Sequence, residues 1–215
     1  GLEVTMIAIP AGEASKTMET ALSVMKEMLT LGADRTSVII ALGGGVVGDL
    51  AGFVASVYMR GIPYIQIPTT LMAQVDSSIG GKTAVDLPEG KNLIGTFNQP
   101  QAIYIDLKFL ETLSEKEMKN GLAEIIKAGI IEDISLFNLL EAETKAVRER
   151  HRSILAAIVE KAVRVKKGIV ELDEREKGLR RILNFGHTMG HALEAESGYG
   201  MSHGEAVSIG MVAAA

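Results

Sequence analysis

The first half of the chain alternates short apolar runs with amphipathic stretches. Runs 37–42 (SVIIAL), 63–67 (PYIQI) and 102–107 (AIYIDL) have the length of strands and little polar alternation. Residues 15–31 and 46–59 carry apolar side chains at helical spacing. Strands of this kind, separated by helices, are typical of a mainly parallel sheet covered on both faces. We therefore predict an α/β domain over residues 1–112.

The second half carries no strand signal. Ser114 is followed by Glu115 and Glu117, a typical helix start, and apolar residues at helical spacing continue to residue 131. Further helices are predicted over the ranges 135–151, 153–172, 184–196 and 203–215. The sequence thus predicts an all-α domain over residues 113–215. Between the last two strands of the first half, residues 77–100 show little periodicity and are expected to form a long functional loop.

Composition excludes several classes of protein. The net charge of −5 gives no electrostatic case for nucleic-acid binding, and no apolar run is long enough to span a bilayer. The chain lacks cysteine, so a metal would be held by histidines and carboxylates. It starts at Gly1 and stops inside an apparent helix, so we expect a piece of a longer protein.

Three of the four histidines fall within seventeen positions, in GHTMGH (186–191) and HGE (203–205). His187 and His191 are four residues apart, so they share one face of the predicted helix. Two such histidines alone would more often be partly buried core residues. The third histidine, His203, and the neighbouring glycines favour a metal site with acid–base chemistry attached.

A glycine-rich turn follows the first predicted strand, in the sequence GGGVVGD (43–49). Its glycines satisfy G-x-G-x-x-G before an apolar helix, where backbone N–H groups favour a phosphate. The acidic residue usual about 20 positions later is missing, so a standard dinucleotide-binding unit is not expected. A nucleotide site of another type is favoured over a plain tight turn.

Two further stretches combine charge with glycine or apolar residues. Asp76 and Lys82 flank DSSIGGK, which lacks the first glycine of a P-loop, so an ATPase is rejected. Lys82 and Lys91 are candidate anion contacts in the same predicted loop. Glu124 and Lys127 share an apolar helix face, where a carboxylate needs a partner. If the helix near residue 184 begins early, Arg180, Asn184, His187 and His191 form one polar stripe.

Together these stretches resemble the 3-dehydroquinate synthase family of sugar-phosphate cyclases. The resemblance covers nearly the whole chain, in family order, and lies in the segments ALGGGVVGDLAGFVASVYMRGI, IPTTLMAQVDSSIGGKTAVD, KNLIGTF, GLAEIIKAGII and LNFGHTMGHALE…HGEAVSIGM. It implies an NAD-binding α/β domain followed by a helical metal- and substrate-binding domain. Family chains are longer at both ends.

The resemblance also implies roles for individual residues. A divalent metal, zinc or cobalt, would be held by Glu124, His187 and His203. NAD would contact Glu13, Lys16, Gly44, Gly45, Asp49, Thr69, Thr70, Lys91 and Thr112. Substrate would be bound by Arg60, Lys82, Asn92, Lys127, Lys166, Arg180 and Asn184. Among the residues next to the metal, His191, Lys127, Asp76 and Asn184 are implied to be catalytic.

The implied reaction converts 3-deoxy-D-arabino-heptulosonate 7-phosphate to 3-dehydroquinate and phosphate in the shikimate pathway, with NAD regenerated. The resemblance also implies a cytoplasmic homodimer in which Arg60 reaches the neighbouring subunit's site. Two alternatives stay open: a sister cyclase acting on another sugar phosphate, and a metal-dependent alcohol dehydrogenase of the glycerol dehydrogenase type.

Overall fold

The computed structural model describes residues 3–198 and 200–215, and its contacts divide them into two compact units. The first unit comprises the chain up to Pro68 together with Gly81–Ile105, and the second comprises Thr69–Gly80 together with Asp106–Ala215. The two units are therefore interleaved in sequence, because residues 69–80 belong with the helices that follow residue 105. The division at residue 112 remains a sequence-based prediction.

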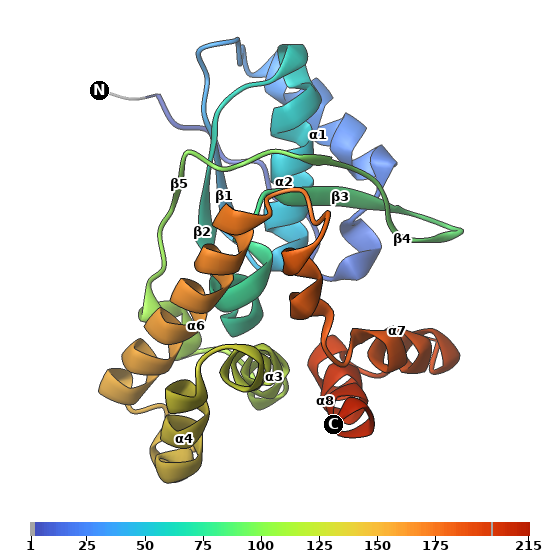
Figure 1. Cartoon of the computed structure of the whole chain (residues 1–215). Coiled ribbons are helices and arrows are strands. Elements are labelled where there is room, and N and C mark those ends of the chain that lie inside the picture. The colour runs from blue at the N-terminus through green and yellow to red at the C-terminus, as the bar shows by residue number, and fades with distance from the viewer. Residues whose placement is uncertain (1–2, 199) are drawn as a thin grey trace. The chain divides into compact units, whose positions relative to one another are not determined.

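The first unit is built on a parallel sheet. Strand β1 (Ile39–Gly43) pairs with β2 (Tyr64–Pro68), and β2 pairs with the short β5 (Ala102–Ile103), all in parallel. Helix α2 (Gly45–Val57) connects β1 to β2 and packs on both strands (Figure 1). Helix α1 (Met18–Thr30) packs against α2, and Thr17 caps its N-terminus. The parallel sheet predicted from the apolar runs is confirmed.

One face of β1 carries exposed apolar side chains. Val38, just before β1, and Ile40 and Leu42 within it are each about half exposed, whereas Ala41 is buried. The expectation that both faces of the sheet are covered is therefore not met for this strand within the described residues. The core of the unit lies on the α2 side and includes Tyr64, whose pKa burial raises to about 12.

The region predicted as a long loop contains a β-hairpin. Strands β3 (Lys82–Leu87) and β4 (Gly90–Phe97) pair antiparallel, with an irregularity between Val85 and Leu87. The prediction of an irregular loop over residues 77–100 was therefore wrong for most of its length. β3 packs on α1 and α2, and Cβ at Gly52 would lie 2.5 Å from the Thr83 side chain, which explains a glycine on that helix face.

The second unit is helical. Its long helices are α3 (Glu115–Ile131) and α6 (Arg152–Leu172), and the shorter ones are α4 (Ile134–Ala142), α5 (Thr144–Arg148), α7 (His187–Glu196) and α8 (His203–Ala214). A π-helical turn, Ala73–Ser77, packs against α3 and α6. The predicted start of α3 is confirmed, because Ser114 Oγ accepts a hydrogen bond from Glu117 N.

Two helices differ from their predicted extents. The helix predicted over residues 135–151 is divided into α4 and α5 around Glu143. The helix predicted to begin at residue 184 is broken, since a 3₁₀ segment (Leu179–Asn184) ends there and Gly186 adopts a left-handed φ of 78° before α7. Arg180 and Asn184 therefore do not form one continuous stripe with His187 and His191. Within the described residues, no helix has the length and apolar character needed to cross a membrane.

Candidate active site

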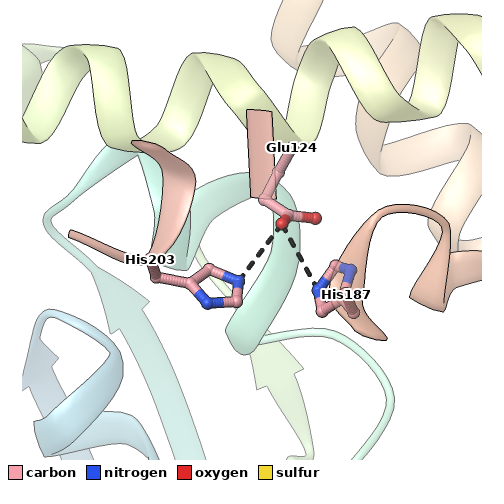
Figure 2. Close-up of side chains that lie close together, drawn as sticks. All are labelled: Glu124, His187 and His203. Atoms are coloured by element: carbon pink, nitrogen blue, oxygen red, sulfur yellow. Dashed lines mark ion pairs between the residues drawn. The ribbon is translucent and has the colours of Figure 1, made fainter. Parts of the chain in front are cut away.

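Three candidate metal ligands converge in the helical unit. Glu124 lies in the middle of α3, whereas His187 and His203 are the first residues of α7 and α8. Figure 2 shows both imidazoles turned toward the same carboxylate oxygen. His187 Nε2 lies 3.7 Å from Glu124 Oε1, and His203 Nε2 lies 3.4 Å from it. Side chains separated by up to 79 positions thus meet at one point.

Glycines allow the two histidine-bearing helix starts to approach each other and α3. A Cβ at Gly210 of α8 would lie 2.0 Å from the carbonyl oxygen of Gly186, immediately before α7. A Cβ at Gly204 would lie 2.2 Å from the carbonyl oxygen of Asn120 on α3. Because no side chain fits at either position, we infer that these glycines set the positions of His187 and His203.

The donor atoms fit a divalent metal. Two donors each about 2.1 Å from one tetrahedral ion lie about 3.4 Å apart, close to the separations from Glu124 Oε1. Glu124 is only 3% exposed, and its Oε1 accepts no hydrogen bond from any described residue. A buried carboxylate oxygen normally has a partner. One carboxylate and two imidazoles are ligands typical of a catalytic zinc or cobalt ion.

The ionisation of the cluster follows from its contacts. Burial and the Asp76 charge oppose ionisation of Glu124, but the contact with His203 and the ion pair with Lys127 outweigh them and lower its pKa. Burial lowers the pKa of His187, and the Lys127 charge adds to this effect. Burial also disfavours the His203 cation, yet Glu124 and Glu194 outweigh it and raise that pKa. Glu124 is therefore ionised, which is the form in which a carboxylate binds a metal.

A chain of buried charges extends from this cluster. Lys127 Nζ forms an ion pair with Glu124 Oε2 inside α3. Lys166 on α6 donates to Asp76, in the π-helical turn, at both the side chain and the backbone carbonyl. Burial alone would raise the pKa of Asp76, but the charges of Lys166 and Lys127 outweigh burial, so the pKa is lowered. The charge of His203 also lowers this pKa. Four residues thus form a continuous polar cluster: Glu124, Lys127, Asp76 and Lys166.

Arg180 and Asn184 occupy different surroundings. Arg180 is 2% exposed and donates to the carbonyl of Gly80 at 3.1 Å, and burial is the main cause of its lowered pKa. Asn184 is exposed and donates to Glu176 Oε1 at 2.9 Å, beside an open hollow that Phe185 and Thr188 also line. The structure thus does not bring Asn184 into the ion-paired cluster around Glu124.

His191 lies beside two of the candidate metal ligands, His187 and His203. Its ring centre is 5.3 Å from that of His187 and 6.0 Å from that of His203. It forms a second possible ligand group with Glu194 and His203. Glu194 is a buried acid that the sequence analysis did not single out, and its Oε2 lies 3.2 Å from His203 Nδ1. The only signal in the sequence was a carboxylate three residues after His191.

A second group of predicted residues meets in the first unit. Lys16 Nζ donates to Asp49 Oδ2 and to Asn92 Oδ1, each at 2.6 Å. Gly44 and Gly45 form the start of α2 at the carboxyl end of β1, as the glycine motif predicts. A Cβ at Gly43 would lie 2.5 Å from the Val47 side chain. This turn leaves the first N–H groups of α2 without intrahelical partners, which suits a nucleotide phosphate.

The other predicted residues are more scattered. The Arg60 side chain is exposed, and its backbone adopts the left-handed conformation with φ 73°. Glu13 lies in a 3₁₀ turn. Lys82 and Lys91 belong to the hairpin strands rather than to a loop. The remaining predicted NAD contacts lie in the helical unit: Thr69, Thr70 and Thr112. Thr70 Oγ1 accepts a hydrogen bond from Ala73 N at the start of the π-helical turn.

The fold and the site together define a class: proteins with an α/β part carrying a glycine-rich strand-to-helix turn, followed by a helical part with a Glu–His–His cluster. Residues 6–120 match the family profile of the 3-dehydroquinate synthase N-terminal part, and residues 121–215 match that of the C-terminal part. The chain belongs to the 3-dehydroquinate synthase family.

Curated relatives agree with this family. The chain is 56% identical over 207 residues to the 3-dehydroquinate synthase of Dictyoglomus thermophilum, covering 96% of this chain and 58% of that protein. It is 55% identical over 216 residues to that of Desulforamulus reducens, covering 100% of this chain and 60% of that protein. The chain thus spans about 60% of the length of these relatives.

Solved structures show the same architecture. A 2-epi-5-epi-valiolone synthase from Streptomyces hygroscopicus, with NAD⁺ and Zn²⁺ bound, has a TM-score of 0.89 at 38% identity over 94% of this chain and 57% of that one. A 2-deoxy-scyllo-inosose synthase bound to carbaglucose-6-phosphate, NAD⁺ and Co²⁺ has a TM-score of 0.86 at 32% identity over 95% and 56%. A probable glycerol dehydrogenase from Sinorhizobium meliloti shares the fold at 16% identity, with a TM-score of 0.64 over 92% and 60%.

Proposed function

We propose that this chain carries the catalytic centre of a 3-dehydroquinate synthase, which converts 3-deoxy-D-arabino-heptulosonate 7-phosphate to 3-dehydroquinate and phosphate. The observation that carries the proposal is the Glu124–His187–His203 cluster joined to buried cations. Identity above 50% to named 3-dehydroquinate synthases supports this substrate over those of the sister cyclases.

Two bound groups would supply chemistry that side chains lack. Glu124, His187 and His203 would hold a divalent metal, and Gly44 and Gly45 would lie against the phosphates of NAD. When bound, NAD would take up and return a hydride while the metal lowers the pKa of a substrate hydroxyl. Both groups occur in solved cyclases of this fold, which supports their assignment here.

The chain's own residues would bind and orient the substrate. Lys127, Lys166 and Arg180 supply cationic donors, which suit a substrate bearing a carboxylate and a phosphate. Each is buried, so its charge acts through a medium of low dielectric and its position is fixed by neighbours. Asp76, held as an anion by Lys166, would accept a hydrogen bond from a substrate hydroxyl or exchange a proton with it.

His191 and Asn184 are proposed to act on the substrate side of the metal. His191 lies near both imidazole ligands yet is exposed, so it has room to contact substrate and move a proton. Asn184 would exchange its contact with Glu176 for one with the substrate. The family resemblance also supports a homodimer in which the exposed Arg60 contributes to the neighbouring subunit's site.

An alcohol dehydrogenase of the glycerol dehydrogenase type is the second candidate. The similarity that favours it, at 16% identity, concerns the fold alone. A small neutral alcohol gives no role to the buried cations Lys127, Lys166 and Arg180, and placing such cations in a protein interior is costly without a function. The cyclase therefore accounts for more of the site.

The substrate assignment can be tested with purified protein, NAD and Co²⁺. Incubation with the heptulosonate phosphate should yield 3-dehydroquinate, detected by mass spectrometry, whereas glucose 6-phosphate should give no carbocycle. A Glu124→Gln variant serves as the inactive control. Carbocycle formation from glucose 6-phosphate but not from the heptulosonate phosphate would assign the chain to a sister cyclase instead.

A further inference from the structure

Glu194 lies behind one of the candidate metal ligands. It is located on α7, nine positions before the start of α8, and is 8% exposed. Its Oε2 is 3.2 Å from His203 Nδ1, while Nε2 of the same ring is 3.4 Å from Glu124 Oε1. The His203 imidazole is therefore held between two buried carboxylates, one on each ring nitrogen.

This arrangement determines which nitrogen can bind a metal. An ionised carboxylate only accepts hydrogen bonds, so a neutral His203 that carries its hydrogen on Nδ1 donates it to Glu194 and keeps Nε2 free to bind a metal. The Nε2 lone pair is then directed toward the point where a metal would lie between the ring and Glu124. His187 follows the same rule, because its Nδ1 lies 3.2 Å from the carbonyl oxygen of Phe185, another pure acceptor. Both imidazoles thus present Nε2, the same nitrogen, to the shared point.

We propose that Glu194 is a positioning residue for the metal site, fixing the tautomer and ring orientation of His203. The inference rests on the proposed metal ligands and adds a residue to which no role has been assigned. A carboxylate behind a ligating histidine also makes the imidazole more basic, and losing such a partner weakens metal binding by about 10- to 100-fold. Glu194 acts through His203 and does not itself touch the ion.

The alternative is that Glu194 is itself a ligand, together with His191 and His203. Using Nδ1 of His203 for that purpose would break its hydrogen bond to Glu194. It would also leave Glu124 Oε1, buried and without a hydrogen bond among the described residues, still without a partner. Such an orphaned oxygen is costly in the interior. The geometry therefore favours Glu124 as ligand and Glu194 as support.

The test is a Co²⁺ titration of the purified protein, read by visible absorption and by competition with a chelator. Glu194→Gln should raise the Kd for Co²⁺ by about 10-fold and Glu194→Ala by up to about 100-fold, because glutamine keeps an oxygen acceptor. Both should still bind one equivalent but with shifted absorption bands, since the His203 ring is no longer held. Circular dichroism verifies that each variant is folded.

Glu196→Gln is the matched control, because this exposed acid lies on the same helix and the charge change is identical. Its Kd and absorption bands should equal those of the unaltered protein. Unchanged affinity and unchanged bands in both Glu194 variants would overturn the positioning role. Complete loss of binding in Glu194→Gln and also in His191→Ala would instead make Glu194 a ligand.

A wrong assignment of the metal ligands would give a different result from a wrong assignment of Glu194. Glu124→Gln should abolish tight Co²⁺ binding. If the unaltered protein bound no Co²⁺, or bound it equally well after Glu124→Gln, the ligand assignment itself would be wrong whatever the Glu194 variants did. The two outcomes are therefore distinguishable within one set of titrations.

Discussion

The ammonium group of Lys166 lies 2.5 Å from Asp76 Oδ1 and 2.6 Å from the backbone carbonyl oxygen of the same residue. The lysine comes from α6 and the aspartate from the π-helical turn, 90 positions earlier in the chain. A single side chain thus neutralises a carboxylate and satisfies a carbonyl in a turn that is irregular.

Lys166→Met should destabilise the fold. It removes the cation from a largely buried pair and leaves Asp76 without compensation, which should lower the free energy of unfolding by about 2–4 kcal/mol. Urea denaturation followed by circular dichroism measures this difference. Lys167→Met is the matched control, because its pair with Glu171 is exposed and should contribute less than about 1 kcal/mol. Equal effects of the two substitutions would contradict the account.

The same pair predicts how stability varies with pH. Because Lys166 and Lys127 lower the pKa of Asp76 below its ordinary value of 3.8, its ionised form stabilises the folded state above that value. That contribution is lost as the pH falls and protons bind. The stability difference between the unaltered protein and Asp76→Asn should therefore shrink between about pH 5 and pH 2. Urea unfolding of both proteins at several pH values measures this difference. A stability difference that stays constant with pH would contradict the prediction.

His191 and His187 should respond differently to removal. His187→Ala should lose metal and activity together, since its Nε2 faces Glu124 Oε1. His191→Ala should keep nearly stoichiometric metal while turnover falls by about 10²-fold, as expected for a residue in acid–base steps. Elemental analysis alongside turnover separates the two. His151→Ala, an exposed histidine outside the cluster, is the control. Loss of metal from His191→Ala would make His191 a ligand.

The position of Gly121 leaves no space for even a methyl side chain. A Cβ at this position of α3 would lie 2.6 Å from both Leu71 Cβ and Met72 N, so Gly121→Ala should destabilise the protein by about 1–3 kcal/mol. It should also weaken Co²⁺ binding, because Glu124 is one turn further along α3. Gly168→Ala on α6 meets nothing within 4 Å and should stabilise by about 0.5–1 kcal/mol. Thermal unfolding distinguishes the two variants. A change in stability of the same sign in both would contradict this prediction.

The predictable part of the fold is the part that periodicity controls. Continuous apolar runs correctly predicted the parallel strands β1 and β2, and Ser114 correctly predicted the start of α3. The β3–β4 hairpin was missed because its strands carry lysine, asparagine and glycine, and pairing between strands leaves no local signal. The break before α7 was missed because a glycine inside an apolar stretch does not reveal that it adopts φ 78°.

The site shows the same limit. Glu124, His187 and His203 were identified from residue type and family resemblance, and the structure brings them together. Glu194 was not identified, since a glutamate on an amphipathic stretch is ordinarily solvated and only tertiary packing buries it against His203. Asn184 was expected beside the cluster but faces Glu176, because the helix does not continue through Phe185 and Gly186.

We propose that the site eliminates phosphate with NAD acting catalytically. The most direct measurement follows phosphate release and absorbance at the NADH band in one reaction, with the heptulosonate phosphate, Co²⁺ and substoichiometric NAD. The account predicts many equivalents of phosphate per NAD and no net NADH. Stoichiometric NADH without phosphate would contradict it and identify an alcohol dehydrogenase.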